Sequence, residues 1–152
     1  MRTNRAGKGV APMPRSVGQR FPGADASVPE ARSFLRHVLS EWEVTDRADD
    51  MLTGVSELAT NAVRHGLPPG GRFAVEVSLD DGCLRIEVHD ATWRHPRMSR
   101  PTAEATAGRG LLLVNALADV WGVKPHAVSG KTVWTEFKVK TRQELPSGAT
   151  RC

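Results

Sequence analysis

The sequence predicts a single α+β domain, on the basis of its length and of two kinds of hydrophobic periodicity. The 152 residues, with a mass of 16.5 kDa, are enough for one domain and too few for two of ordinary size. Apolar residues recur every three or four positions in the first half of the chain and then every second position, which is typical of helices followed by strands. A content of 39% hydrophobic and 25% charged residues argues against a disordered or fibrous protein.

Two helices are expected in the first half of the chain. The first begins with Ser27 as its N-cap and ends near Trp42. The second begins at Thr45 or Asp46 and continues to Gly66. The apolar positions expected to face the core are Phe34, Leu35, Val38, Leu39, Met51, Leu52, Val55, Leu58, Ala59, Ala62 and Val63.

Strands are expected in the second half. Strict alternation predicts a pair at 73–79 and 84–90, and the Asp-Gly dipeptide at 81–82 is typical of a hairpin turn between them. Two further alternating segments, 120–123 and 132–139, predict two more strands.

Residues 1–26 and 141–152 are expected to be irregular tails, which leaves 27–140 as the folded domain. The formal net charge is +4, and the first 24 residues hold five basic side chains and no acid, so the body is nearly neutral. Nucleic-acid binding is therefore not expected, because the body offers no basic stripe and the aromatic content is only 5%.

The cysteines and the apolar segments predict a cytoplasmic protein. Cys83 and Cys152 give neither a disulfide framework nor zinc-ligand spacing. A zinc site from His65, His89 and His95 has no support from paired cysteines or an HExxH motif. No secretory signal is apparent, and no apolar run is long enough to span a bilayer.

Three polar residues recur every four positions on the second expected helix: Glu57, Asn61 and His65. They share one face beside the apolar stripe. A glutamate can accept a proton from a hydroxyl, and an asparagine oxygen can bind Mg²⁺. The alternative is a solvated helix face, with His65 acting only as a cation at the helix C-terminus.

Asp90 lies at the end of the second strand of the expected hairpin, in phase with its apolar positions. The alternation therefore predicts that this carboxylate faces the core. A buried carboxylate needs hydrogen-bond donors, and a ligand amino group or an ordered water would supply one. A turn cap for the following loop is the alternative.

A loop at 91–107 leads into an apolar helix that is expected from Leu111 to Ala118. The glycines of Gly108-Arg-Gly110 at its start would let backbone N–H groups approach phosphate oxygens, where the helix dipole also favours an anion. A plain joint between loop and helix is the alternative, because a single GxG is a weak signal.

Taken together, four segments resemble the motifs of a known superfamily. They are ELATNAVRHG at 57–66, VHD ending at Asp90, AGRGLLLV at 107–114 and GKTVWTEF at 130–137. These segments resemble the N, G1, G2 and terminal-strand motifs of the GHKL (histidine-kinase-like) ATPase and kinase superfamily. The short length and the DVWGV segment are most similar to the anti-sigma-factor serine/threonine kinases of actinomycete type.

The resemblance covers about residues 28 to 140 and implies a two-layer sandwich, with helices on one face of a mixed, mainly antiparallel sheet. ATP would lie between the two layers. By match to the motifs, Glu57 would be the general base, Asn61 the Mg²⁺ ligand and Asp90 the acceptor of the adenine amino group. The remaining residues expected to bind the nucleotide are Gly108, Arg109, Gly110, Leu111 and Thr132.

The resemblance also implies protein partners: a sigma factor, a STAS-like anti-anti-sigma protein that carries the phosphorylated hydroxyl, and a second copy in a homodimer. One departure stands out, because Thr92 and Arg94 occupy positions where the superfamily generally has glycines. Two hypotheses follow. The chain is either a protein kinase that also sequesters a sigma factor or an ATP-binding regulator with weak or no catalysis.

Overall fold

The computed structural model describes residues 14–66, 70–90, 113–126 and 130–140. Residues 113–117 form a short helix, in addition to the longer elements. In chain order those elements are β2 (Arg15–Pro22), α1 (Ser27–Glu41), α2 (Ala48–Asn61), the π-helical turn η1 (Ala62–Gly66), β3 (Arg72–Asp80), β4 (Cys83–Asp90), β5 (Val120–Pro125) and β6 (Lys131–Lys138).

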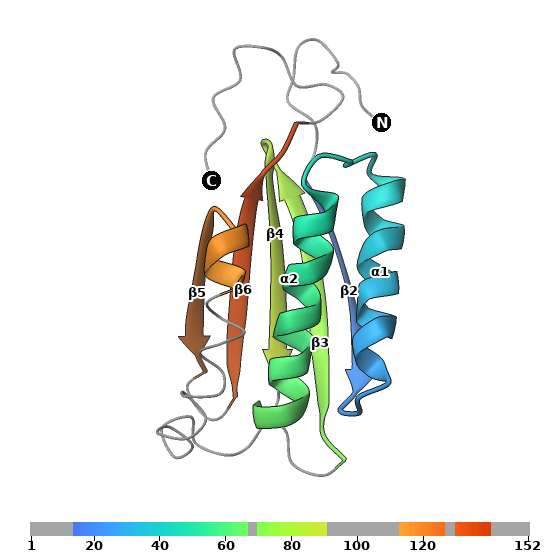
Figure 1. Ribbon diagram of the computed structural model, residues 1–152, viewed down its shortest axis with the longest axis vertical. Helices are drawn as coiled ribbons and strands as arrows, with labels where there is room; N and C mark the ends of the chain where they lie inside the picture. The colour runs from blue at the N-terminus through green and yellow to red at the C-terminus, as the bar shows by residue number, and fades with distance from the viewer. Residues whose placement is uncertain (1–13, 67–69, 91–112, 127–129, 141–152) are drawn as a thin grey trace.

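The strands form one sheet in the order β2-β3-β4-β6-β5, with α1 and α2 side by side on one face (Figure 1). The predicted two-layer α+β sandwich is confirmed. Every pairing among the described strands is antiparallel, so this part of the sheet lacks the parallel pair that a mixed sheet implies.

The core lies between the sheet and the two helices. Residues 73–79 and 84–90 alternate between buried and more exposed positions as predicted, and the turn at 81–82 joins them. The largest side chains with under 2% exposure are Phe21, Phe73, Phe137, Leu35, Met51, Leu58, Leu84 and Ile86. Burial of these apolar surfaces is the main favourable contribution to folding.

Strand β2 was not predicted, and the expectation of an irregular tail through residue 26 is wrong here. The strand lies at the sheet edge and pairs with β3 along its whole length. All its side chains are exposed except that of Phe21, which stacks on Phe73 with ring centroids 5.3 Å apart. Backbone pairing and one aromatic anchor hold this strand, so its sequence shows no alternation.

The helix starts also differ from the predictions. Ser27 is the first residue of α1 and is buried, while the N-cap is Ala26, which makes no side-chain cap. Helix α2 begins at Ala48, two or three residues later than expected. No helix in the described part of the chain is long and apolar enough to cross a membrane. The cytoplasmic location stays a prediction.

The expectation that the two cysteines give no disulfide framework does not hold for Cys83. Its sulfur, at the start of β4, is disulfide-bonded. Cys152, the other cysteine of the chain, lies outside the described residues. Sequence spacing alone gives no sign of such a bond.

Arg47 connects the start of α2 to the β6 and β5 strands at one edge of the sheet. Its Nη1 donates to Asp119 Oδ2 at 2.6 Å and its Nη2 to the Leu117 carbonyl at 2.7 Å. The guanidinium also lies 5.1 Å from the centroid of the Phe137 ring. Asp119 Oδ2 accepts a second hydrogen bond, from the Lys138 backbone N–H at 2.7 Å. Three separate segments of the chain therefore meet at one guanidinium and one carboxylate.

These contacts set the acidity of Asp119. Partial burial by itself raises the pKa, but the hydrogen bonds from Lys138 and Arg47 and their positive charges outweigh it. The pKa of Asp119 is therefore below its ordinary value of 3.8.

We expect Asp119→Asn to lower the free energy of unfolding by about 1–2 kcal/mol at pH 7, because the ion pair is only partly exposed. The carboxylate has a depressed pKa in the folded state, so its contribution is full above pH 3.8 and is lost as the pH falls through the folded value. Urea unfolding at pH 7 and pH 3 tests both points. The exposed Asp80→Asn serves as control, and a loss of equal size in both variants would contradict the assignment.

Candidate functional site

The candidate site begins with a buried ion pair at one end of the sheet. Asp90 ends β4 with 3% exposure, on the same face as the apolar residues of the strand, as predicted. Lys131 begins β6 directly opposite, and its Nζ donates to Asp90 Oδ2 at 2.6 Å. The chain thus supplies a donor of its own, whereas the sequence led us to expect a ligand amino group or an ordered water as the partner of this carboxylate.

Lys131 is a residue of the candidate site that was not predicted from the sequence. The segment at 130–137 that contains Lys131 predicted a strand. Which residue of that strand lies opposite Asp90 depends on the register between β4 and β6. That register comes from packing of strands far apart in the chain. A lysine at the first position of the last strand is the only local signal.

Glu57 and Asn61 lie about one helical turn apart on α2. Arg32 of α1 donates to Ser56 Oγ at 2.9 Å, which places Ser56 against α1. Glu57 stands about 100° further round the helix, and Asn61 follows one turn later. Both side chains are half-buried, and neither makes a hydrogen bond or ion pair with any other described residue.

His65 belongs to the π-helical turn η1, which continues α2. Single π turns within helices are frequently found at functional sites. Burial, followed by the positive charges of Lys131 and Arg64, lowers the pKa of the His65 imidazole. The positive charge of Lys131 therefore acts on the His65 imidazole. Figure 1 shows the end of this helix at the same end of the molecule as the arrowhead of β4.

These residues form the group that we call the Asp90 site: Glu57, Asn61, His65, Asp90 and Lys131. The group thus contains a half-buried carboxylate and amide on α2 and a buried carboxylate paired with a lysine at the end of the sheet, so it offers acceptors for amino groups and metal ions and one cation.

The phosphate-binding residues expected at Gly108, Arg109, Gly110 and Leu111 lie outside the described residues, as does the loop with Thr92 and Arg94. Thr132 is described, and the structure does not bring it together with Asp90. Its hydroxyl is on the opposite face of the sheet, hydrogen-bonded to His89 Nδ1 at 2.7 Å and to His126 Nε2 at 2.8 Å.

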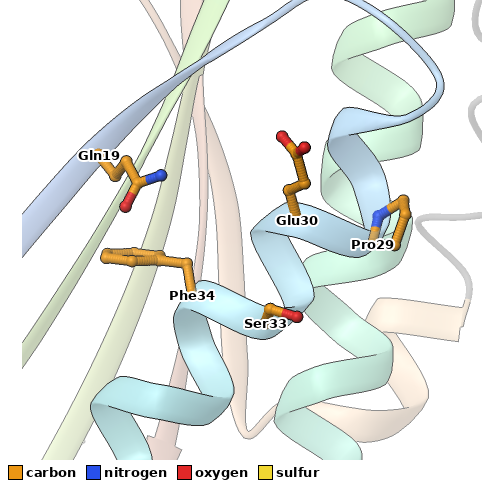
Figure 2. A pocket seen from close by; sticks show the side chains of 5 residues that line it. All are labelled: Gln19, Pro29, Glu30, Ser33 and Phe34. Atoms are coloured by element: carbon orange, nitrogen blue, oxygen red, sulfur yellow. The ribbon is translucent and has the colours of Figure 1, made fainter.

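A separate hollow opens between β2 and α1 at the far edge of the sheet. Figure 2 shows its lining, which is Gln19, Pro29, Glu30, Ser33 and Phe34. It shares no residue with the Asp90 site. Its one titratable side chain, Glu30, is exposed.

The fold and the Asp90 site define an α+β domain that would hold a ligand between a helical layer and the end of an antiparallel sheet. Residues 21–136 match the family model of the histidine kinase-like ATPase domain, and the chain belongs to this family. The resemblance noted in the sequence is confirmed at this level.

Two known proteins show further similarity. Anti-sigma F factor of Geobacillus stearothermophilus is 25% identical over 131 residues, which are 76% of this chain and 90% of that protein. A solved structure of the RsbU and RsbW domains of Rv1364c from Mycobacterium tuberculosis aligns with a TM-score of 0.63 at 22% identity. The alignment covers 82% of this chain and only 32% of that longer chain, and it supports the fold alone.

We expect Lys131→Met to raise the pKa of His65 toward 6.5, because it removes one of the charges that lower it. The variant should also lose about 2–3 kcal/mol of stability, since a buried carboxylate loses its cation. Histidine NMR titration and urea unfolding measure the two effects.

The exposed Lys124→Met on β5 is the matched control. The double variant Asp90→Asn with Lys131→Met should be more stable than Lys131→Met alone, because no uncompensated charge remains. An unchanged His65 titration in Lys131→Met would show that the lysine does not act on the helix end.

Proposed function

We propose that this chain is an ATP-binding anti-sigma regulator that phosphorylates a serine or threonine of an anti-anti-sigma partner. Membership of the histidine kinase-like ATPase family supports nucleotide binding. The similarity to an anti-sigma F factor over most of both chains supports the regulatory role. A sigma factor, a STAS-like phosphorylated partner and a second copy of the chain are its proposed protein partners.

The buried carboxylate of Asp90 is the observation that carries the proposal. A carboxylate has about four lone-pair positions, so it can accept a hydrogen bond from Lys131 and one from an exocyclic amino group together. A site of this kind favours adenine, whose edge presents an amino donor. It disfavours a base that would place a carbonyl oxygen against the acid.

The residues on α2 fit Mg²⁺ and phosphoryl transfer. The Asn61 amide oxygen is a hard ligand, and Mg²⁺ usually takes one or two protein ligands and completes its shell with phosphate oxygens and waters. Mg²⁺-bound ATP would supply the phosphoryl group. Glu57 would accept the proton of the attacking hydroxyl as the new P–O bond forms and ADP leaves. Gly108, Arg109, Gly110 and Leu111 remain the proposed phosphate contacts.

One observation favours a second candidate, an ATP-binding regulator without significant catalysis. Lys131 Nζ lies 2.6 Å from the carboxylate proposed to bind adenine, and the nucleotide must share that carboxylate with the lysine. Weaker nucleotide binding leaves protein binding as the main activity. The two candidates differ in one measurable quantity, phosphate transfer to an authentic partner.

We expect Asp90→Asn to weaken Mg²⁺-ATP binding by at least about tenfold, because one charge-assisted hydrogen bond to the base is lost. The variant should stay folded, since the amide keeps the size of the side chain. Calorimetric titration of nucleotide measures the change, and circular dichroism checks the fold. Asp80→Asn at the other end of the same hairpin is the control. Equal ATP affinity in all three proteins would exclude Asp90 from the nucleotide site.

We expect Glu57→Gln to slow phosphorylation of the partner by about 10²-fold or more while nucleotide and partner binding are kept, because a general base acts only in the transfer step. Mass spectrometry of the partner after incubation with Mg²⁺-ATP measures the rate, with the exposed Glu30→Gln as control. Unchanged transfer in Glu57→Gln would remove this residue from the mechanism. Absence of transfer in the unmutated protein, with ATP and partner both bound, would establish the second candidate.

A further inference from the structure

A second polar cluster lies on the outer face of the sheet, opposite the helices and the Asp90 site. Glu87 and His89 are two residues apart on β4 and share that face, and Glu76 of β3 is directly opposite Glu87. His89 Nε2 lies 3.0 Å from Glu87 Oε1 and 3.5 Å from Glu76 Oε1. One nitrogen and two oxygens therefore converge, and all three lie within 4.8 Å of one another.

Each carboxylate is held by its other oxygen. Ser16 Oγ of β2 donates to Glu76 Oε2 at 3.3 Å. Arg85 Nε donates to Glu87 Oε2 at 2.6 Å, and the same guanidinium reaches Glu136 at 2.6 Å. These donors orient the carboxylates so that both Oε1 atoms face His89. This arrangement is typical of metal ligands, which are fixed by hydrogen bonds from a second layer of residues.

The imidazole of His89 is fixed in the same way. Its Nδ1 is 2.7 Å from Thr132 Oγ1, which in turn is 2.8 Å from His126 Nε2. When Nδ1 carries the proton and donates it to Thr132, the Thr132 hydroxyl can donate to His126. Nε2 then presents a lone pair to two carboxylate oxygens, which is unfavourable unless a cation lies between them.

His89 Nε2 itself is buried and makes no hydrogen bond with any described residue. Glu87 Oε1 is 3.0 Å and Glu76 Oε1 is 3.5 Å from this nitrogen, so two carboxylate oxygens lie near a ring nitrogen that no hydrogen bond satisfies. A metal ion bound to Nε2 and to both oxygens would satisfy all three atoms.

We propose that Glu76, Glu87 and His89 bind a divalent ion of the zinc class. Zinc lies about 2.0–2.2 Å from nitrogen and oxygen ligands, so neighbouring ligands of a tetrahedral ion are roughly 3.3 Å apart. The 3.0 Å and 3.5 Å separations bracket that spacing. An imidazole ligand selects zinc and similar metals over Mg²⁺ and Ca²⁺, which prefer oxygen alone.

The cation also resolves an electrostatic conflict in the sheet. Glu76 and Glu87 are a directly opposite pair of like charges, an arrangement that destabilises an antiparallel sheet. Arg85 compensates part of this charge at Glu87, and a divalent ion at the convergence point would neutralise the charge that remains on the two carboxylates. Because the site spans β3 and β4 on the face away from Asp90, its occupant is separate from the proposed nucleotide and its Mg²⁺.

Calorimetric titration with Zn²⁺ alone tests the proposal, on full-length protein that is free of tag, nucleotide and metal. We expect about one zinc ion per chain, and binding at least about tenfold weaker in His89→Ala and in Glu87→Gln. His37→Ala is the matched control. His37 lies 3.4 Å from Glu41 on α1 and is a histidine–carboxylate pair in which both side chains are exposed.

Absence of zinc binding would overturn the proposal, and so would equal affinity in the unmutated protein and in His89→Ala. Displacement of zinc by an equal concentration of Mg²⁺ would also overturn the assignment to the zinc class. If circular dichroism shows that His89→Ala is unfolded, zinc titration of Glu76→Gln provides the second test. Glu76 is about half-exposed, so its amide variant keeps the packing while it removes one ligand charge.

Discussion

The two-residue turn at Asp81 and Gly82 fixes the register of the sheet, and both polar clusters depend on it. Its residues have φ angles of 55° and 75°, the conformation that matches the twist of a tight hairpin. From this turn the pairing runs without interruption to the far end, where Phe73 is opposite Asp90. A slip of one residue would turn Asp90 to solvent and His89 into the core. This turn thus determines which side chains of β4 face the helices.

Arg47 performs a similar role for the helical layer. Its backbone is left-handed, with a φ of 66°, a conformation that costs a non-glycine residue about 1–2 kcal/mol. The hydrogen bonds to Asp119 and Leu117 and the contact with Phe137 compensate for that cost. Because Arg47 immediately precedes α2, these contacts fix where the helix begins. They thereby fix the turn on which Glu57 and Asn61 lie.

The parts of the fold that follow from local patterns could be predicted from the sequence. Strict alternation identified β3 and β4 and the inward direction of Asp90, and helical spacing placed Glu57 and Asn61 beside the apolar stripe. The parts that depend on contacts between distant segments could not. Strand β2 has one buried anchor, Phe21. The pairing of Asp90 with Lys131 requires the register of two strands whose paired residues are 41 positions apart in the sequence. The cluster at Glu76, Glu87 and His89 appears only when β3 and β4 are aligned.

The indole of Trp134 gives the outer face of the sheet an optical reporter. Gly122 is opposite it on β5, and a Cβ atom there would come within 2.6 Å of the ring, so the glycine leaves the space that the indole occupies. The guanidinium of Arg85 lies 4.3 Å from the ring centroid and also holds Glu87. A change of charge at Glu87 therefore reaches the indole through one intervening side chain. In a variant that keeps Trp134 and replaces the other three tryptophans, fluorescence emission would report the electrostatic state of this face without an added label.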